Sequence, residues 1–344
     1  MKTVSLTLLA GLLASAAGTA QAAGLDLSKY QVSIGTTLGK NMPVSRVYEA
    51  GAITYNWDRD SLLAIGDEAH ANEFATDGGV FPGTYDYLGV SSFNDPEGVT
   101  YIGNGQYVFA EERTTRIWKV GLDDYTVDMG NGRTRRFFAE GDPAYSYTVS
   151  GGDNWGNQGL EGISYDPVTG GFFAVKETNS QRVMFIDWDF ETANSAGTTV
   201  DLFDASVLGL NSLSDIATLS TAAAFENADF RENLLILSAK SNKLLEVTRA
   251  GEIVSEFDLS GILNDVTGLP ISTIEGVTVG ADGSIYLAAE LGGISSQGGT
   301  SSFIKLSRVQ TAAVPEPATW AMMLGGLGLV GGAMRRRKMS VAFA

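Results

Sequence analysis

Two sets of acidic residues recur along the sequence at matching places in a repeated unit. The first set opens five successive units and comprises Glu49, Glu97, Glu161, Asp215 and Glu275. The second set follows the second apolar run of each unit and comprises Asp67 or Glu68, Glu111 with Glu112, Glu177, and Glu290. Carboxylates that are crowded together repel one another and take up protons unless a cation relieves them. The pattern therefore predicts a calcium site, because Ca²⁺ accepts six to eight oxygen ligands with flexible geometry.

A structural role explains the first set equally well. A glutamate that opens each unit can accept backbone N–H groups from the neighbouring unit, and Gly98, Gly162 and Gly276 permit a close approach there. The fourth unit also departs from the second set, because Ser238 and Lys240 stand where the other units carry carboxylates. A metal cage built from every unit is therefore not expected.

Catalysis would need further groups beside these carboxylates. A hydrolase that acts on phosphate uses Lys or Arg near the metal, and the candidates are Arg113, Lys176 and Lys240, each of which can instead pair with a neighbouring Glu. His70 is the only histidine, which excludes a His-rich zinc site and a His-based metalloprotease motif. The absence of cysteine excludes a thiol nucleophile and disulfides. No catalytic residue is assigned.

The elements that must position these residues are short alternating strands joined by glycine-rich turns. Asp282-Gly283 and Asn104-Gly105 lie between apolar runs and predict hairpins. The first set recurs at intervals between 48 residues (Glu49 to Glu97) and 64 residues (Glu97 to Glu161). Blades of a β-propeller repeat every 40–50 residues or so, and the longer intervals hold insertions such as 123–155 and 222–231.

We therefore expect an all-β propeller, with five blades favoured and six as the alternative. Helical periodicity is nearly absent between the two ends of the chain. The segment Leu25–Gly35 precedes the first unit and is expected to supply a strand that closes the ring with the last blade. The net charge of −17 makes nucleic acid an improbable partner.

The amino-acid sequences of the repeated units resemble those of a known family. DPEGVTYIGNGQYVFAEER, GLEGISYDPVTGGFFAVKE, ENLLILSAKSNKLLEVTRAGEIVSEFDL and IEGVTVGADGSIYLAAE are similar to units of the SdiA-regulated family of exported bacterial propellers. The resemblance covers most of Tyr48–Val309 and implies a propeller that is calcium-linked and distantly phytase-like. The loops Glu68–Gly89 and Asp123–Trp155 are longer than the family pattern, so the surface function is expected to differ.

The two ends of the chain carry targeting signals. Residues 1–23 are predicted to be a secretory signal peptide, with Lys2, an apolar stretch at Val4–Leu13 and the small-x-small pattern Ala20-Gln21-Ala22. The propeller domain is assigned to residues 24–313. Residues 314–344 contain Pro315-Glu316-Pro317, an apolar run and a basic cluster.

This tripartite tail resembles the PEP-CTERM sorting signal. The apolar run Ala318–Met334 is at the short limit for a transmembrane helix, and the basic residues Arg335–Lys338 would stay cytoplasmic. The resemblance implies processing by an exosortase of a Gram-negative bacterium, after transient anchoring in the inner membrane. A permanent single-span anchor is the alternative.

These observations lead to three functional hypotheses. The first is a binding protein at the cell surface or in the extracellular matrix, with calcium at the carboxylate ring. The second is a calcium-dependent hydrolase of phosphoesters or lactones, in which the metal polarises a substrate oxygen or activates water. The third is a structural matrix component. Extracellular polysaccharide is a possible partner, because aromatic residues in the insertions can stack on sugar rings. Packing in the core is the alternative role for these residues, which are Phe81, Tyr85, Tyr87, Tyr145, Tyr147 and Trp155.

Overall fold

The computed structural model divides the chain into two compact units, Met1–Arg308 and Val309–Ala344. In the first unit it describes residues 23–38, 47, 49–66, 70–79, 81, 88–89, 93, 95–130, 133–138, 141–149, 153, 155–262, 271–291 and 301–308. In the second unit it describes residue 309 and the helical positions Met322, Leu327 and Leu329. The predicted signal peptide lies outside the described residues except for Ala23, and the sorting helix lies outside except for these three positions. No helix among the described residues is long and apolar enough to cross a membrane.

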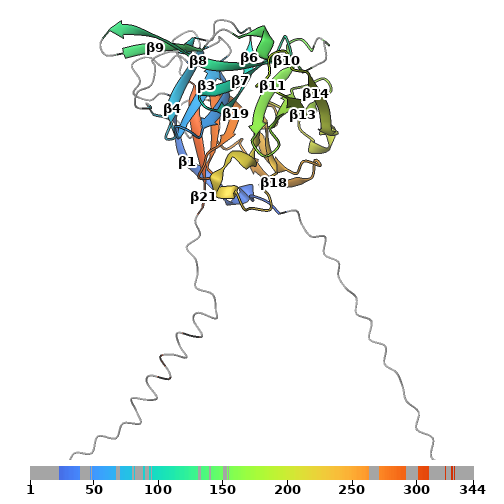
Figure 1. The fold of residues 1–344 in the computed structure, drawn as a ribbon. Helices are drawn as coiled ribbons and strands as arrows, with labels where there is room; N and C mark the ends of the chain where they lie inside the picture. Colours follow the sequence, from blue (N-terminus) through green and yellow to red (C-terminus); the bar gives the residue numbers. More distant parts are fainter. Residues whose placement is uncertain are drawn as a thin grey trace, which may run out of the picture. The chain divides into compact units, whose positions relative to one another are not determined.

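The strands of the first unit form five blades, which confirms the predicted fold (Figure 1). Blade 1 contains β2 (Ala50–Asn56), β3 (Ser61–Gly66) and β4 (His70–Ala75). Blade 2 contains β6 (Pro96–Gly103), β7 (Gln106–Glu111), β8 (Arg116–Gly130) and β10 (Ser146–Thr148). Blade 3 contains β11 (Leu160–Asp166), β12 (Gly171–Lys176), β13 (Arg182–Trp188) and β14 (Gly197–Phe203).

The remaining blades complete the ring. Blade 4 contains β15 (Asp215–Thr218), β16 (Leu234–Ser238), β17 (Lys243–Val247) and β18 (Ile253–Asp258). Blade 5 contains β19 (Ile271–Val279), β20 (Ile285–Leu291), β21 (Ser302–Arg308) and the N-terminal strand β1 (Tyr30–Thr37). Two further strands, β5 (Leu88–Gly89) and β9 (Arg133–Phe138), join blades 1 and 2 into one sheet.

Five 3₁₀ turns connect the described strands. They are η1 (Leu27–Lys29), η2 (Pro143–Tyr145), η3 (Ala205–Leu208), η4 (Leu219–Thr221) and η5 (Ala223–Phe225). The predicted hairpins also form. Asn104 and Gly105 have φ values of 55° and 72°, as a type I′ turn between β6 and β7 requires. Gly283 has a φ of 79° at the turn between β19 and β20.

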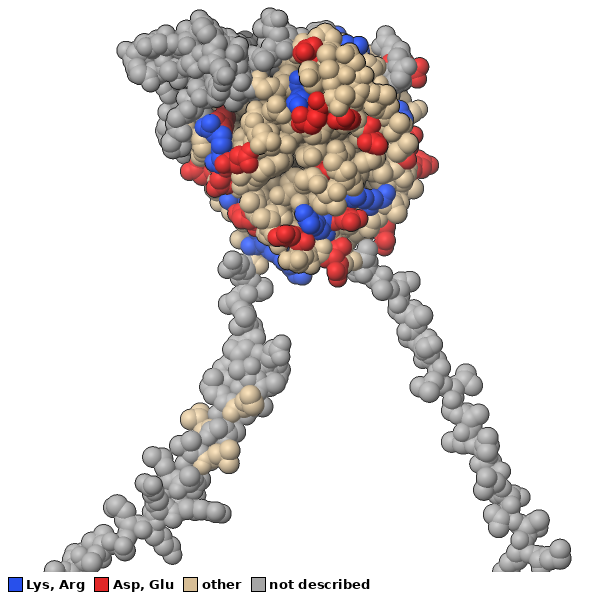
Figure 2. All heavy atoms as spheres, in the orientation of Figure 1, with Lys and Arg blue, Asp and Glu red and all other residues tan. Residues whose placement is uncertain are grey.

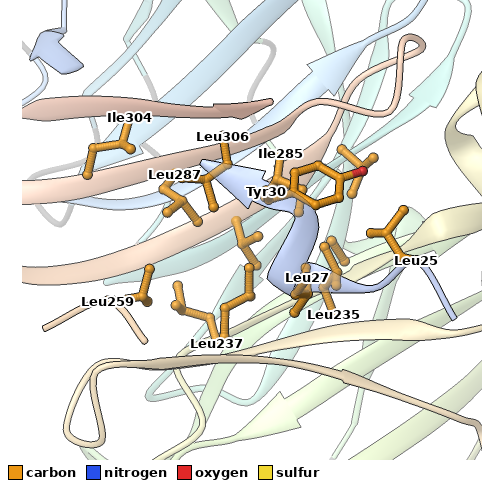
Figure 3. Close-up of a cluster of buried hydrophobic side chains, with 14 of the residues drawn as sticks. Leu25, Leu27, Tyr30, Leu235, Leu237, Leu259, Ile285, Leu287, Ile304 and Leu306 are labelled. Carbon is orange, nitrogen blue, oxygen red and sulfur yellow. The ribbon is translucent and has the colours of Figure 1, made fainter. Parts of the chain in front are cut away.

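The N-terminal segment closes the ring, as the sequence predicts. β1 runs antiparallel to β21, with Tyr30 opposite Arg308 and Thr37 opposite Ser302. Just before β1, the backbone N–H of Leu25 donates to Glu246 Oε1 of blade 4 at 2.7 Å. The same segment also contributes Leu25 and Leu27 to an apolar cluster shared with blades 4 and 5 (Figure 3). Residues 23–30 therefore bind two blades at once.

The first strands of the blades lie side by side around the central axis in one register. Tyr101 N donates to Thr54 Oγ1 at 3.0 Å. Three more bonds repeat this contact between neighbouring blades: Tyr165 N to Thr100 Oγ1 at 2.9 Å, Thr218 N to Ser164 Oγ at 3.0 Å, and Tyr55 N to Thr278 Oγ1 at 3.2 Å. These bonds define equivalent positions in the blades, which are Thr54, Thr100, Ser164, Ala217 and Thr278.

Glycine permits the close approach of neighbouring first strands. A Cβ atom on Gly98 would lie 2.5 Å from the carbonyl oxygen of Glu161 in the next blade. A Cβ atom on Gly162 would lie 2.5 Å from the Cα of Asp215. A side chain at either position would push two blades apart. The glycine of these Glu-Gly pairs is therefore needed for the packing of neighbouring blades.

Candidate metal centre

Carboxylates surround a cavity of about 300 Å³ at the end of the ring where first strands begin and second strands end. Its described lining consists of Asp95, Glu97, Glu112, Arg113, Asn157, Glu161, Glu177, Glu275 and Glu290. Acidic side chains are also spread over the outer face seen in Figure 2, so acidity alone does not distinguish the cavity. What distinguishes it is that several of its carboxylates are partly or fully withdrawn from water.

The structure brings together three members of the first predicted set. Glu97, Glu161 and Glu275 each precede the shared hydroxyl position by three residues, and all three line the cavity. Glu49 does not line it. By the same register Gly51 is the equivalent of Glu97, and Glu49 is the equivalent of Asp95, with which it shares a positive φ.

Asp215 lies one residue further along its strand than the glutamates. It occupies the position of Gly98 and Gly162, is buried, and does not line the cavity. Its Oδ2 accepts the backbone N–H of Val277 at 2.7 Å, and its Oδ1 accepts that of Ile216 at 2.8 Å. Burial raises the pKa of Asp215 well above its ordinary value, while these two N–H groups oppose the rise. Asp215 thus connects blade 4 to blade 5.

Three members of the second set reach the cavity. Glu112, Glu177 and Glu290, all predicted as members of this set, line it. Glu111, which precedes Glu112, does not. Its carboxylate accepts hydrogen bonds from Trp118 Nε1 at 2.9 Å and from Thr114 Oγ1 at 2.5 Å. Successive residues of an extended chain point to opposite faces, which explains why Glu112, directly after the end of β7, reaches the cavity and Glu111 does not.

Some predicted positions lie outside the described residues. Asp67 and Glu68 do so entirely, and of His70 only the backbone at the start of β4 is described. Besides Asn157, the sequence interpretation missed Asp95. It stands two residues before Glu97, and the acidic residue at the same offset in blade 1 is Glu49. That correspondence is visible only once the strand register is known.

Three carboxylates lie close enough to share one ion. Asp95, Glu97 and Glu112 each offer an oxygen, and these oxygens all lie within 4.8 Å of one another. Calcium–oxygen distances are about 2.3–2.6 Å, so two ligands on opposite sides of one calcium ion lie at most about 5 Å apart. The donor set, all oxygen and all anionic, therefore fits a hard divalent cation.

Electrostatics in the cavity oppose full ionisation of its carboxylates. Burial, together with the negative charges of Glu97, Glu112 and Glu177, raises the pKa of Glu161 to about 11. Burial also raises the pKa of Glu112. With a pKa of about 11, Glu161 holds its proton at neutral pH, and a nearby cation would favour its release.

Two basic side chains reach the described lining. Arg113 forms an ion pair with Asp95, and Lys240 Nζ lies 2.5 Å from Glu177 Oε1. Lys176, the third candidate from the sequence, instead donates to the carbonyl oxygens of Thr178 and Asn179 at 2.5 and 3.0 Å. Burial lowers its pKa. Lys176 is therefore not a cavity group.

The described aromatic residues of the insertions contact other protein groups. Arg59 lies over the ring of Phe81 at 5.0 Å, and Lys119 lies over Tyr145 at 5.6 Å. Tyr147 stacks on Trp188 with 6.4 Å between ring centroids, and Arg182 lies 5.4 Å from the ring centroid of Trp155. These contacts favour a packing role. Tyr85 and Tyr87 lie outside the described residues.

Comparison with known proteins gives two family matches. A family model described as SdiA-regulated matches residues 23–291. A model described as the PEP-CTERM protein-sorting motif matches residues 313–338. Both agree with the resemblances seen in the sequence.

Several solved structures have a similar arrangement of the chain. Glutaminyl cyclase from Myxococcus xanthus is 12% identical, with 81% of this chain and 97% of that chain covered and a TM-score of 0.49. A luciferin-regenerating enzyme is 10% identical, with 80% and 96% covered and a TM-score of 0.44. Virginiamycin B lyase from Staphylococcus aureus is 14% identical, with 84% and 75% covered and a TM-score of 0.33. At these identities and TM-scores no statement about activity follows.

Proposed function

The chain belongs to the SdiA-regulated family, and from this premise we propose that it is a calcium-binding propeller that acts as a binding protein. Its PEP-CTERM motif implies an exported protein and exosortase-type processing at the C-terminus. We place its action at the cell surface or in the extracellular matrix. The calcium ion would hold the carboxylates of the cavity together and present an open coordination position to a ligand.

One observation carries this proposal. Seven carboxylates line the described part of the cavity, where Arg113 pairs with Asp95 and Lys240 pairs with Glu177. Such an excess of negative charge in a partly buried space is unfavourable without a counter-ion. A divalent cation relieves it more completely than protonation does, because it engages several oxygens at once.

The residues that would hold the ion are those whose oxygens already converge. Asp95, Glu97 and Glu112 form the core of the set, and Glu161 adjoins it. Glu177 and Glu290 line the cavity near the ends of the second strands of blades 3 and 5, and their carboxylates would add negative charge around the ion. Calcium is favoured over magnesium, because Mg²⁺ demands near-ideal octahedral geometry and gives up its waters reluctantly.

Isothermal titration of the metal-stripped protein tests the proposal. We expect calcium uptake, weaker or absent magnesium uptake, and at least a tenfold loss of calcium affinity in Glu97→Gln. Glu256→Gln is the matched control, because Glu256 is exposed and pairs with Lys243 on the outer edge of blade 4. An absence of calcium heat in protein shown by elemental analysis to be metal-free would contradict the proposal.

The alternative is a calcium-dependent hydrolase of phosphoesters or lactones. The observation in its favour is that Arg113 lines the cavity beside the carboxylates, where it would face an anionic substrate. Its ion pair with Asp95 opposes this role, since the guanidinium is already engaged. A phosphatase and lactonase substrate panel with and without EDTA separates the two functions, because EDTA-sensitive turnover that Arg113→Gln abolishes would favour the hydrolase.

Extracellular polysaccharide is the partner that we propose for the binding protein. Its support is the sorting motif, which implies export. Co-sedimentation of the purified protein with isolated polysaccharide, in calcium and in EDTA, is the direct test. Calcium-dependent co-sedimentation is expected. Its absence, with calcium uptake intact, would leave the ion site standing and remove only this partner.

A further inference from the structure

A second, much smaller cavity lies on the axis of the propeller. Its volume is about 10 Å³, and residues from the first strands of all five blades line it. This is roughly the smallest space that accommodates the centre of one water molecule. The acidic cavity and this axial cavity have no described lining residue in common.

Four residues with buried hydroxyl groups line the axial cavity at equivalent positions. Thr54, Thr100, Ser164 and Thr278 are 5%, 5%, 8% and 9% exposed. Each hydroxyl oxygen accepts one backbone N–H from the next blade, through the four bonds that define the register. A hydroxyl that accepts one bond still has a proton to donate and a second lone pair.

These four protons lack a protein acceptor in the described part of the chain. The hydrogen bonds of Thr54, Thr100, Ser164 and Thr278 there are those received from the neighbouring blades. A buried donor without an acceptor is unfavourable, and ordered water is the usual remedy where space allows. The space and the donors coincide at the axis.

The charge of the surroundings selects the occupant. The carboxylates of Glu97, Glu161 and Glu275 start three residues before the hydroxyls, roughly 10 Å along a strand at about 3.3 Å per residue. Their negative potential opposes a halide ion. A cation would occupy the lone pairs and leave the hydroxyl protons unpaired. A water molecule accepts two hydrogen bonds and donates two, so it can accept the protons of two of these hydroxyls and donate to the lone pairs of the other two, whereas a cation leaves all four protons unpaired.

We propose that the axial cavity binds a single water molecule that hydrogen-bonds to Thr54, Thr100, Ser164 and Thr278. This water links blades 1, 2, 3 and 5 across the axis. Blade 4 is the exception, because its equivalent residue is Ala217. The adjacent Thr218 donates its hydroxyl proton to Ser220 Oγ at 3.0 Å.

Water-to-amide nuclear Overhauser spectroscopy on the purified, isotope-labelled protein tests the site in solution. A water molecule that stays bound for longer than about a nanosecond gives water–amide cross-peaks with the sign typical of a bound molecule. We expect such cross-peaks at the amide protons of Tyr55, Tyr101 and Tyr165. Their absence would overturn the proposal. In crystals soaked with bromide and, separately, with rubidium, we expect an axial density peak without anomalous signal. An anomalous peak from either ion would show an ion site instead.

Variants of Thr100 connect the signal to the hydroxyls. Thr100→Val keeps the side-chain volume and removes the hydroxyl, so the cross-peak at Tyr165 should be lost. Thr100→Ser keeps the hydroxyl and should retain the cross-peak, and the exposed Thr198→Val controls for the substitution itself. A cross-peak of unchanged intensity in Thr100→Val would contradict coordination by the hydroxyl. The serine variant keeps this comparison possible if the valine variant does not fold.

Discussion

Removal of the Glu246 carboxylate should detach the N-terminal segment and cost a large part of the stability of the propeller. Glu246 is fully buried. Its carboxylate accepts four hydrogen bonds: from Leu25 N at 2.7 Å, Asp26 N at 3.3 Å, Asn233 Nδ2 at 2.8 Å and Ser255 Oγ at 2.7 Å.

The magnitude follows from these contacts. Hydrogen bonds to a charged group contribute about 1.5–3 kcal/mol each, but water replaces some of them once the segment is released. We therefore expect Glu246→Ala to lower the free energy of unfolding by about 3–5 kcal/mol, because the backbone and side-chain donors that remain lose their acceptor. Since a domain is stabilised by only about 5–15 kcal/mol, this is a severe loss.

Urea unfolding and hydrogen exchange measure the effect. The midpoint should fall strongly in Glu246→Ala and change little in Glu256→Gln, which alters an exposed ion pair. Exchange at the Leu25 amide should accelerate. A loss below about 1 kcal/mol with Leu25 still protected would refute the reasoning.

A double-mutant cycle with Gly24→Ala sharpens the test. A Cβ atom on Gly24 would lie 2.3 Å from Val254 Cγ1 and 3.1 Å from Glu246 Oε2, so the single variant should be destabilised. In the Glu246→Ala background the segment is already released, and Gly24→Ala should add little. Additive effects would indicate that the two residues act independently.

Three further predictions follow from the cavity and the blade contacts. Because the pKa of Glu161 is raised to about 11, the folded metal-free protein binds a proton that the unfolded chain releases above about pH 4.5. The melting temperature of the protein should therefore fall as pH rises from 5 to 8. Either Glu161→Gln or saturating calcium should make this dependence of the melting temperature on pH weaker. Gly162→Ala should lower the free energy of unfolding in urea by about 2 kcal/mol or more, because the added Cβ would clash with Asp215. Gly261→Ala should not lower it, because there is open space around Gly261. Asn72 is buried, and both of its side-chain polar atoms lack a hydrogen-bond partner among the residues that the structure describes, so Asn72→Leu should be neutral or stabilising by about 1 kcal/mol in the same assay.

Local patterns in the sequence were sufficient to predict most of the fold. The turns at Asn104-Gly105 and Asp282-Gly283 depend on residues that tolerate positive φ, and the strands beside them alternate. The closing strand was predictable because a propeller needs one and the segment before Tyr48 alternates suitably. The number of blades followed from the spacing of the repeat.

The site was predictable only in part, because its geometry depends on strand register. Irregular pairing occurs at the start of the first strands, between Ala50 and Ala52 and between Pro96 and Gly98. A shift of one residue turns a side chain to the other face. Glu49 and Asp215 therefore appear equivalent to Glu97 in the sequence repeat, but they occupy different positions in the structure.

The pairing of β1 with β21 constrains the order in which the chain folds. Tyr30 lies opposite Arg308, 278 residues later. Contacts between such distant segments form slowly, because the chain entropy of a long loop is lost before the contact stabilises it. The ring cannot close until the last strand has been synthesised. We therefore expect closure of the ring by β1 to be a late step of folding, after β21 is available for pairing.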